Sequence, residues 1–209
     1  YTGSLGGNGA LTHAGAFFRG MSPITMDYTA AEAAWRAGLD PQRADPPMHG
    51  SFEDQAGVPD TFLAKLSPPM QARQVSAWRQ LFSQEEKEPD IVHLNHLTPM
   101  HQAAFDVWKN AAIVTHLHGT ELKMIQTILD TPDLKYGQQW IDQMKSSAAR
   151  SRLILTISPH DRALAIDLLG VPQDRVITIP NGVDVDIFRP RQLSDDERLS
   201  NWKQWLVTD

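Results

Sequence analysis

The chain has 209 residues, 41% of them hydrophobic and 21% charged, and its net charge is −6. This composition is typical of a globular protein, and the acidic balance excludes the basic surface expected of a nucleic-acid-binding protein. The absence of cysteine excludes disulfides and thiol catalysis, and no apolar run approaches the ~20 residues of a membrane span, so we expect a cytoplasmic protein.

A glycine-rich stretch, Gly6-Gly7-Asn8-Gly9, precedes a segment over residues 10–19 whose apolar residues have helical spacing. Backbone N–H groups in such a loop can approach an anion closely. A dinucleotide-binding fingerprint also needs a strand before the glycines, and no strand pattern precedes them here. The stretch therefore indicates either an anion-binding loop without its strand or a simple tail.

The clearest element before residue 90 is a helix. Ser67 and Pro68 are typical of a helix start, and apolar side chains at helical spacing extend the helix to about Phe82. Three weaker elements are predicted before it: a short strand over residues 24–28, an irregular excursion over residues 40–60, and a short strand or turn over residues 62–66.

From residue 90 the pattern alternates regularly between apolar runs and amphipathic segments. Strands are predicted over residues 90–94, 112–117, 153–157 and 176–179. Helices are predicted over residues 98–108, 121–129, 158–169 and around residues 140–144. Alternation of this kind predicts an α/β protein with a doubly wound, mostly parallel, Rossmann-like sheet.

The stretch IVTHLHGTEL, residues 113–122, is where an apolar strand ends and a helix begins. In an open parallel sheet, ligands bind outside the carboxyl ends of the strands. His116 and His118 are two residues apart on the strand and would share a face. We therefore expect His118, Gly119 and Thr120 to lie at a binding site, although both histidines could simply complete a strand.

The other histidines are expected in less specific places. His93 and His96 follow the preceding strand, where His96 could contact a substrate or could be a satisfied loop histidine. His101 and His160 fall in first helical turns and are expected in solvent. Ser158 with Asp161 is explained by a helix cap. Three tryptophans have the helical spacing of core residues: Trp78, Trp108 and Trp140.

Four segments occur in order over residues 90–190: DIVHLN, IVTHLHGTEL, RLILTISPHD and LGVPQDRVITIPNGVDVDIFRP. Together they resemble the N-terminal half of a retaining glycosyltransferase of family 4 with GT-B architecture. The resemblance implies two Rossmann-like domains around a cleft, with residues 1–190 as the acceptor-side domain. Residues 191–209, which open on a capping-box match at Ser194, would be a linker helix leading to a C-terminal nucleotide-sugar-binding domain.

The resemblance also implies roles for individual residues. His118 matches the histidine that faces the transferred sugar and is the candidate catalytic residue. Glu121 stands where the family often has aspartate, and the motif at Asn181 and Gly182 is assigned mainly to the hinge. Together with His96, the candidate substrate-binding residues are Gly6, Gly7, Asn8, Gly119, Thr120, Glu121, Asn181 and Gly182.

The activity implied by this resemblance is transfer of a sugar from a nucleotide-diphosphate sugar to a sugar, polyol or lipid acceptor, with retention of configuration. No metal, no cofactor and no protein nucleophile are expected. The partners would be the donor, the acceptor and the chain's own C-terminal domain, without which this half should be nearly inactive. Membrane contact would be peripheral at most.

Two other kinds of function fit parts of the sequence. A metal-dependent hydrolase could use a cluster of His93, His96, His116 and His118, which are suitable ligand types, but Glu121 is the sole nearby carboxylate in the sequence. A non-catalytic sugar- or nucleotide-binding module would use the same strand ends without the donor half.

Overall fold

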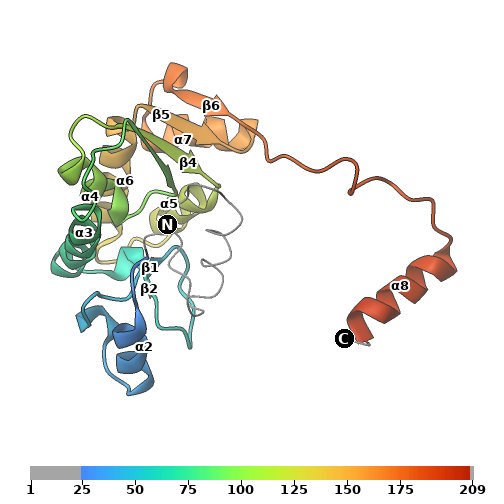
Figure 1. Ribbon diagram of the computed structural model, residues 1–209, viewed down its shortest axis with the longest axis horizontal. Coiled ribbons are helices and arrows are strands. Elements are labelled where there is room, and N and C mark those ends of the chain that lie inside the picture. Colours follow the sequence, from blue (N-terminus) through green and yellow to red (C-terminus); the bar gives the residue numbers. More distant parts are fainter. Residues whose placement is uncertain (1–24, 208–209) are drawn as a thin grey trace. The chain divides into compact units, whose positions relative to one another are not determined.

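The computed structural model describes residues 25–207 (Figure 1). Contacts divide the chain into two compact units, residues 1–179 and residues 180–209. The first unit is built on a four-stranded sheet in which every neighbouring pair is parallel. Its strands, in spatial order, are β3 (Ile91–Asn95), β4 (Ala112–Leu117), β5 (Leu153–Thr156) and β6 (Val176–Thr178).

The connections between these strands are helical, as the alternating pattern predicts. They contain α4 (Pro99–Val107), α5 (Thr120–Leu129), α6 (Gly137–Arg150), α7 (Pro159–Leu169) and the short 3₁₀ helix η3 (Gln173–Arg175). The α/β class and the parallel, Rossmann-like sheet are therefore confirmed. Predicted and observed strand limits agree to within one residue at every end, and side-chain alternation defines a strand better than its termini.

The described crossover helices form one layer against the sheet. The strand order never reverses, so right-handed connections keep these helices on the same face. Alternation along the strands agrees, because that face carries the buried side chains, among them Val92, Ile113, Ile154 and Val176. Side chains of the opposite face, including His93 and His116, are exposed or half-buried.

The segment before β3 contains α2 (Thr29–Arg36), η1 (Pro41–Arg43), β1 (Gly50–Ser51), β2 (Thr61–Phe62), η2 (Leu63–Lys65) and α3 (Pro68–Phe82). The predicted helix at residues 68–82 and the irregular excursion are confirmed. The short strand predicted over residues 24–28 is wrong for the described part, residues 25–28. Tyr28 is instead buried beside Ala31 and Met48 at the start of α2.

Helix α3 packs against α4 and contributes to the part of the core that positions the site. Phe82 stacks on Trp108 with ring centroids 4.5 Å apart, and Trp78 lies 5.7 Å from Phe82. Trp140 is buried among α5, α6 and α7. All three tryptophans predicted as core are therefore buried.

The second unit contains α8 (Asp195–Val207). The predicted capping box is present, since the Ser194 N–H and hydroxyl donate to Glu197 at 2.8 Å and the Glu197 N–H donates back at 3.3 Å. The division after Ile179 falls earlier in the chain than the expected domain limit at residue 190. Among the described residues, no helix has the length and apolarity to cross a membrane.

Candidate functional site

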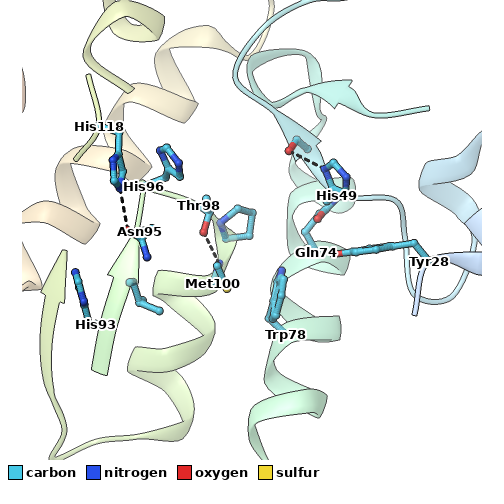
Figure 2. A pocket seen from close by; sticks show the side chains of 13 residues that line it. Tyr28, His49, Gln74, Trp78, His93, Asn95, His96, Thr98, Met100 and His118 are labelled. Carbon is cyan, nitrogen blue, oxygen red and sulfur yellow. Dashed lines mark hydrogen bonds between the residues drawn. The ribbon is translucent and has the colours of Figure 1, made fainter. Parts of the chain in front are cut away.

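A cavity of about 380 Å³ lies at the carboxyl ends of β3 and β4. Figure 2 shows its two walls. One wall comes from β3, the loop after it, the first turn of α4 and the end of β4, and includes His96, Met100 and His118. The other comes from α3 and the segment before it, and includes Tyr28, His49 and Trp78.

Gly119 makes the turn between β4 and α5. Its φ of 88° lies in the left-handed region, and it is the N-cap of α5. A Cβ at this position would lie 3.2 Å from Asp161 Oδ1, so the turn needs glycine for both its conformation and its space. Ser158 holds Asp161, with its hydroxyl 2.6 Å from the carboxylate, and caps α7 as predicted.

His118 is fixed by two hydrogen bonds beside the cavity. Its Nε2 donates to Asn95 Oδ1 at 2.8 Å, and its backbone N–H donates to Glu121 Oε2 at 3.3 Å. Burial, with a smaller contribution from His96, lowers the pKa of His118 below its usual value. The imidazole is therefore neutral at pH 7, with Nδ1 left as a hydrogen-bond acceptor.

His96 and Glu121 form a pair next to His118. His96 has a φ of 62°, and its Nδ1 hydrogen-bonds to Glu121 Oε1. Glu121 is 0% exposed and lies in the first turn of α5, where the helix dipole favours a carboxylate. Glu121 is one of the predicted substrate-binding residues. In the structure its buried side chain contacts His96 and the backbone of His118.

Four imidazoles extend from the open face of the sheet to the cavity. The rings of His93 and His116 stack at 5.5 Å, those of His116 and His118 at 4.4 Å, and His96 lies 4.8 Å from His118. Burial and the neighbouring His118 lower the pKa of His116. No group of three or more His, Cys, Asp or Glu within residues 25–207 could hold a metal ion. The metal-hydrolase alternative therefore has no support in this part of the chain.

His101 corrects one prediction. It was expected in solvent, but it is 0% exposed beneath the first turn of α4, whereas His160 is exposed as predicted. His101 Nδ1 accepts from the Thr98 N–H at 3.4 Å, and its Nε2 donates to Thr115 Oγ1 at 2.9 Å. Burial lowers its pKa to about 3. Its position three residues after the Thr98 N-cap was the missed signal, because a capping box turns that side chain back toward the N-cap backbone.

Other predicted site residues are not brought together by the described structure. Thr120 lines a separate cavity of about 250 Å³, together with Phe52 and Lys123. Gly6, Gly7 and Asn8 lie outside the described residues. Asn181 and Gly182 belong to the second unit, so their role in the site stays a prediction.

Three cavity residues that were not predicted from the sequence come from the part of the chain before β3. Tyr28, His49 and Gln74 line the cavity although they precede β3 by many residues. Tyr28 and His49 meet edge to face at 5.3 Å, and Gln74 donates to Gln42 Oε1 at 2.9 Å. No periodicity or motif indicates that these residues belong to a site. Long-range packing of α3 and of the irregular segment before it brings them to the cavity.

The chain matches one family in a comparison with known protein families. The model of the family described as Glycosyltransferase Family 4 matches residues 31–187. The match spans α2 to β6 and includes the motif at Asn181 and Gly182, but it begins after the glycine-rich stretch at residues 6–9. No curated protein matches the chain.

Proposed function

We propose, because the chain belongs to glycosyltransferase family 4, that it forms the acceptor-side half of a retaining hexosyltransferase. The observation that carries the proposal is the His118-Gly119 turn. It places a neutral imidazole and a helix N-terminus together beside a cavity at the carboxyl ends of two parallel strands. Ligands bind at this edge of open α/β sheets.

The reaction requires stabilisation of opposite charges. The bond between the anomeric carbon and the diphosphate oxygen breaks, a bond to an acceptor hydroxyl oxygen forms, and the hydroxyl proton is released. Positive charge develops on the sugar and negative charge on the leaving diphosphate. Fixed dipoles near these charges lower the barrier, and the N-terminus of α5 is such a dipole. No protein nucleophile is part of the proposal.

His118 would hold a hydroxyl of the transferred sugar. Its Nε2–H is already donated to Asn95, so Nδ1 can accept a hydrogen bond from that hydroxyl. A neutral imidazole adds no positive charge to compete with the developing cation. Gly119 has no side chain, so the sugar can approach the backbone closely.

The donor half would lie in a C-terminal nucleotide-sugar-binding domain, and Asn181 and Gly182 would lie near the hinge between the two domains. Closure of two hinged domains excludes water and strengthens each polar contact. We further propose a cytoplasmic enzyme that needs no metal and no cofactor. Contact with a membrane would be peripheral and would depend on a lipid acceptor.

A donor screen on the natural full-length protein tests this proposal. Release of UDP, GDP or ADP would be followed from a panel of nucleotide-sugars, with and without EDTA, and product configuration would be determined by NMR. We expect release from one donor class, undiminished by EDTA, and an anomer like that of the donor. Failure to release nucleoside diphosphate from any donor would contradict the proposal.

A further inference from the structure

The cavity at the ends of β3 and β4 is lined by several polar side chains but, among the described residues, by no acidic side chain and no Lys or Arg. The lining includes His49, His93, His96 and His118. Glu121 lies just behind His96, yet it is fully buried and already bonded to His96 and His118. In residues 1–24, outside the described part, the sequence contains a single charged side chain, Arg19.

The imidazoles that line the cavity offer lone pairs as well as N–H groups. His49 Nδ1 donates to the Gly50 carbonyl at 3.3 Å, which leaves Nε2 as an acceptor. That Nε2 is buried and has no hydrogen-bond partner within the described chain. In the proposed function His118 Nδ1 is used by the transferred sugar, whereas Asn95, whose oxygen accepts from His118, keeps its amide N–H groups as donors for the acceptor. A buried acceptor without a donor is unfavourable. Because His49 Nε2 is closed to solvent, a ligand hydroxyl would bond to it after a shift of the His49 side chain.

These groups distinguish hydroxyls from phosphates and carboxylates. A hydroxyl both donates and accepts, so it can satisfy lone pairs and N–H groups alike. A phosphate or carboxylate oxygen only accepts, and its charge would enter a cavity whose described lining has no Lys or Arg to balance it. Burial, which lowers the pKa of His118, withholds the imidazolium that could otherwise supply this balance at neutral pH.

The cavity also has an apolar side. Trp78 on α3 lies across the cavity from Met100 on α4 (Figure 2), and Leu94 also belongs to the lining. The face of an aromatic ring packs well against the C–H groups of a sugar ring, and the hydroxyls at the edge of the sugar stay free for hydrogen bonds. The volume of about 380 Å³ lies near the lower end of the ~300–1,000 Å³ typical of small-molecule pockets, which suits a group of monosaccharide size.

We infer that this cavity seats an uncharged, hydroxyl-rich acceptor group, such as a hexose or a cyclic polyol, in preference to a phosphorylated or carboxylated one. The inference rests on the proposed glycosyltransferase function and names the substrate class of the same site. The acceptor oxygen bonds to the anomeric carbon as the donor diphosphate leaves with the electron pair of the broken bond, and the acceptor's hydroxyl proton passes to the leaving diphosphate.

The test uses the natural full-length protein with its donor from the nucleotide-sugar screen. Transfer would be compared between matched acceptors, such as glucose and glucose 6-phosphate, inositol and inositol phosphate, and glucose and glucuronate. We expect kcat/KM to be at least about 100-fold higher for the neutral member of the productive pair. Equal or better use of an anionic acceptor, or no transfer to any neutral member, would overturn the inference while nucleoside diphosphate release still supported the transferase. Loss of all donor turnover would instead be failure of the proposed function.

Two lysine substitutions on α4, one inside the cavity and one outside it, test whether the acceptor's charge is sensed in this cavity. Met100→Lys places an ammonium on the first turn of α4 at the cavity wall. Gln102→Lys adds the same charge to the same helix at an exposed position outside the cavity. We expect Met100→Lys to raise the ratio of kcat/KM for phosphorylated over neutral acceptors at least tenfold, and Gln102→Lys to leave it unchanged. Equal ratios in the two variants would overturn the inference.

Discussion

Glu121 determines the arrangement of the site at the level of single residues. One carboxylate oxygen bonds His96 and the other accepts the His118 N–H, so a single buried side chain orients two histidines. Its position in the first turn of α5 offsets part of the cost of burying a charge, and the hydrogen bonds offset more. Glu121 is therefore a positioning residue, and His96 and His118 present the side chains that line the cavity.

Replacement of His118 by alanine tests the catalytic assignment. The change removes the neutral imidazole beside Gly119 and leaves Asn95 without its donor. We expect kcat of the full-length enzyme to fall about 100-fold or more, as for the loss of one positioned polar group. His160→Ala is the matched control, because His160 is exposed on α7. Steady-state kinetics with the identified donor would measure both variants, and unchanged kcat in His118→Ala would remove His118 from the site.

His101 makes the stability of the chain dependent on pH. Its pKa of about 3 in the folded protein lies below the value of about 6.5 for a free histidine. Between these two values the unfolded chain binds a proton that the folded chain does not. Stability should therefore fall as pH decreases from about 6.5 toward 3, by roughly 1.4 kcal/mol per pH unit from this group.

The variant His101→Gln separates this titration from the others. Glutamine is a preferred capping-box residue three positions after a Thr N-cap, but it does not titrate. We expect lower stability at pH 7, by about 1–3 kcal/mol for the hydrogen bond lost to Thr115, and a shallower decrease in acid. Urea unfolding at several pH values between 7 and 4 would measure both effects. Parallel pH curves for the variant and the wild type would contradict the assignment.

At the scale of elements, the turns around α5 and α7 depend on two glycines with similar conformations. Gly119 and Gly170 have φ values of 88° and 69° and lie at the start of α5 and the end of α7. They differ in their surroundings, because a Cβ would crowd Asp161 at Gly119 and would meet nothing within 4 Å at Gly170. Comparing the two positions separates backbone strain from close packing at the site.

Alanine substitutions at these glycines should therefore have different effects. Both variants should lose about 1 kcal/mol of stability because alanine is strained in the left-handed region. Gly119→Ala should lose more, since Asp161 must shift, and its kcat/KM should fall about tenfold or more because the turn approaches the sugar. Thermal unfolding and steady-state kinetics would measure these changes. A similar loss of kcat/KM in Gly170→Ala would show that the effect is only global destabilisation.

The elements after residue 90 could be predicted because their signals are local. Helix starts at Thr98 and Ser158 carry their own caps, and strand alternation at residues 112–117 matches the buried and half-buried sides of β4. Helix α2 was not predicted although its alanines favour a helix, because it has eight residues, no side-chain cap and a single buried residue, Ala31. His101 was misplaced because polar residues in a first helical turn usually face solvent, whereas this one bonds the Thr98 backbone and Thr115 of β4.

At the scale of the whole molecule, the site combines one wall that the sequence predicts and one that it does not. His96, His118 and Gly119 follow strand ends, and the topology of a parallel sheet brings strand ends to one edge. Tyr28, His49 and Trp78 reach the same cavity only through packing of α3 and the segment before it. Under the proposed function, acceptor selection would therefore depend on the part of the chain whose fold is least evident from its sequence.

The division after Ile179 implies that the first unit is stable without the second. Its core clusters lie wholly within residues 28–176, and the last described hydrogen bond to the sheet is from the Ile179 N–H to the Thr156 carbonyl at 2.8 Å. A chain ending at Ile179 keeps all of these contacts. We expect it to unfold within about 2 °C of the full chain, since a change of 1 kcal/mol shifts the midpoint by ~2–4 °C at this size.

Tryptophan fluorescence gives this truncation a second measurement. Trp202 and Trp205 on α8 are 61% and 65% exposed, whereas Trp78, Trp108 and Trp140 are buried. Removal of residues 180–209 should therefore make the remaining fluorescence less sensitive to acrylamide. The double variant Trp202→Phe, Trp205→Phe in the full chain is the control and should reproduce this lower quenching at an unchanged unfolding midpoint. If truncation instead lowers the midpoint by more than about 4 °C, α8 stabilises the first unit by over 1 kcal/mol and the two units are not independent.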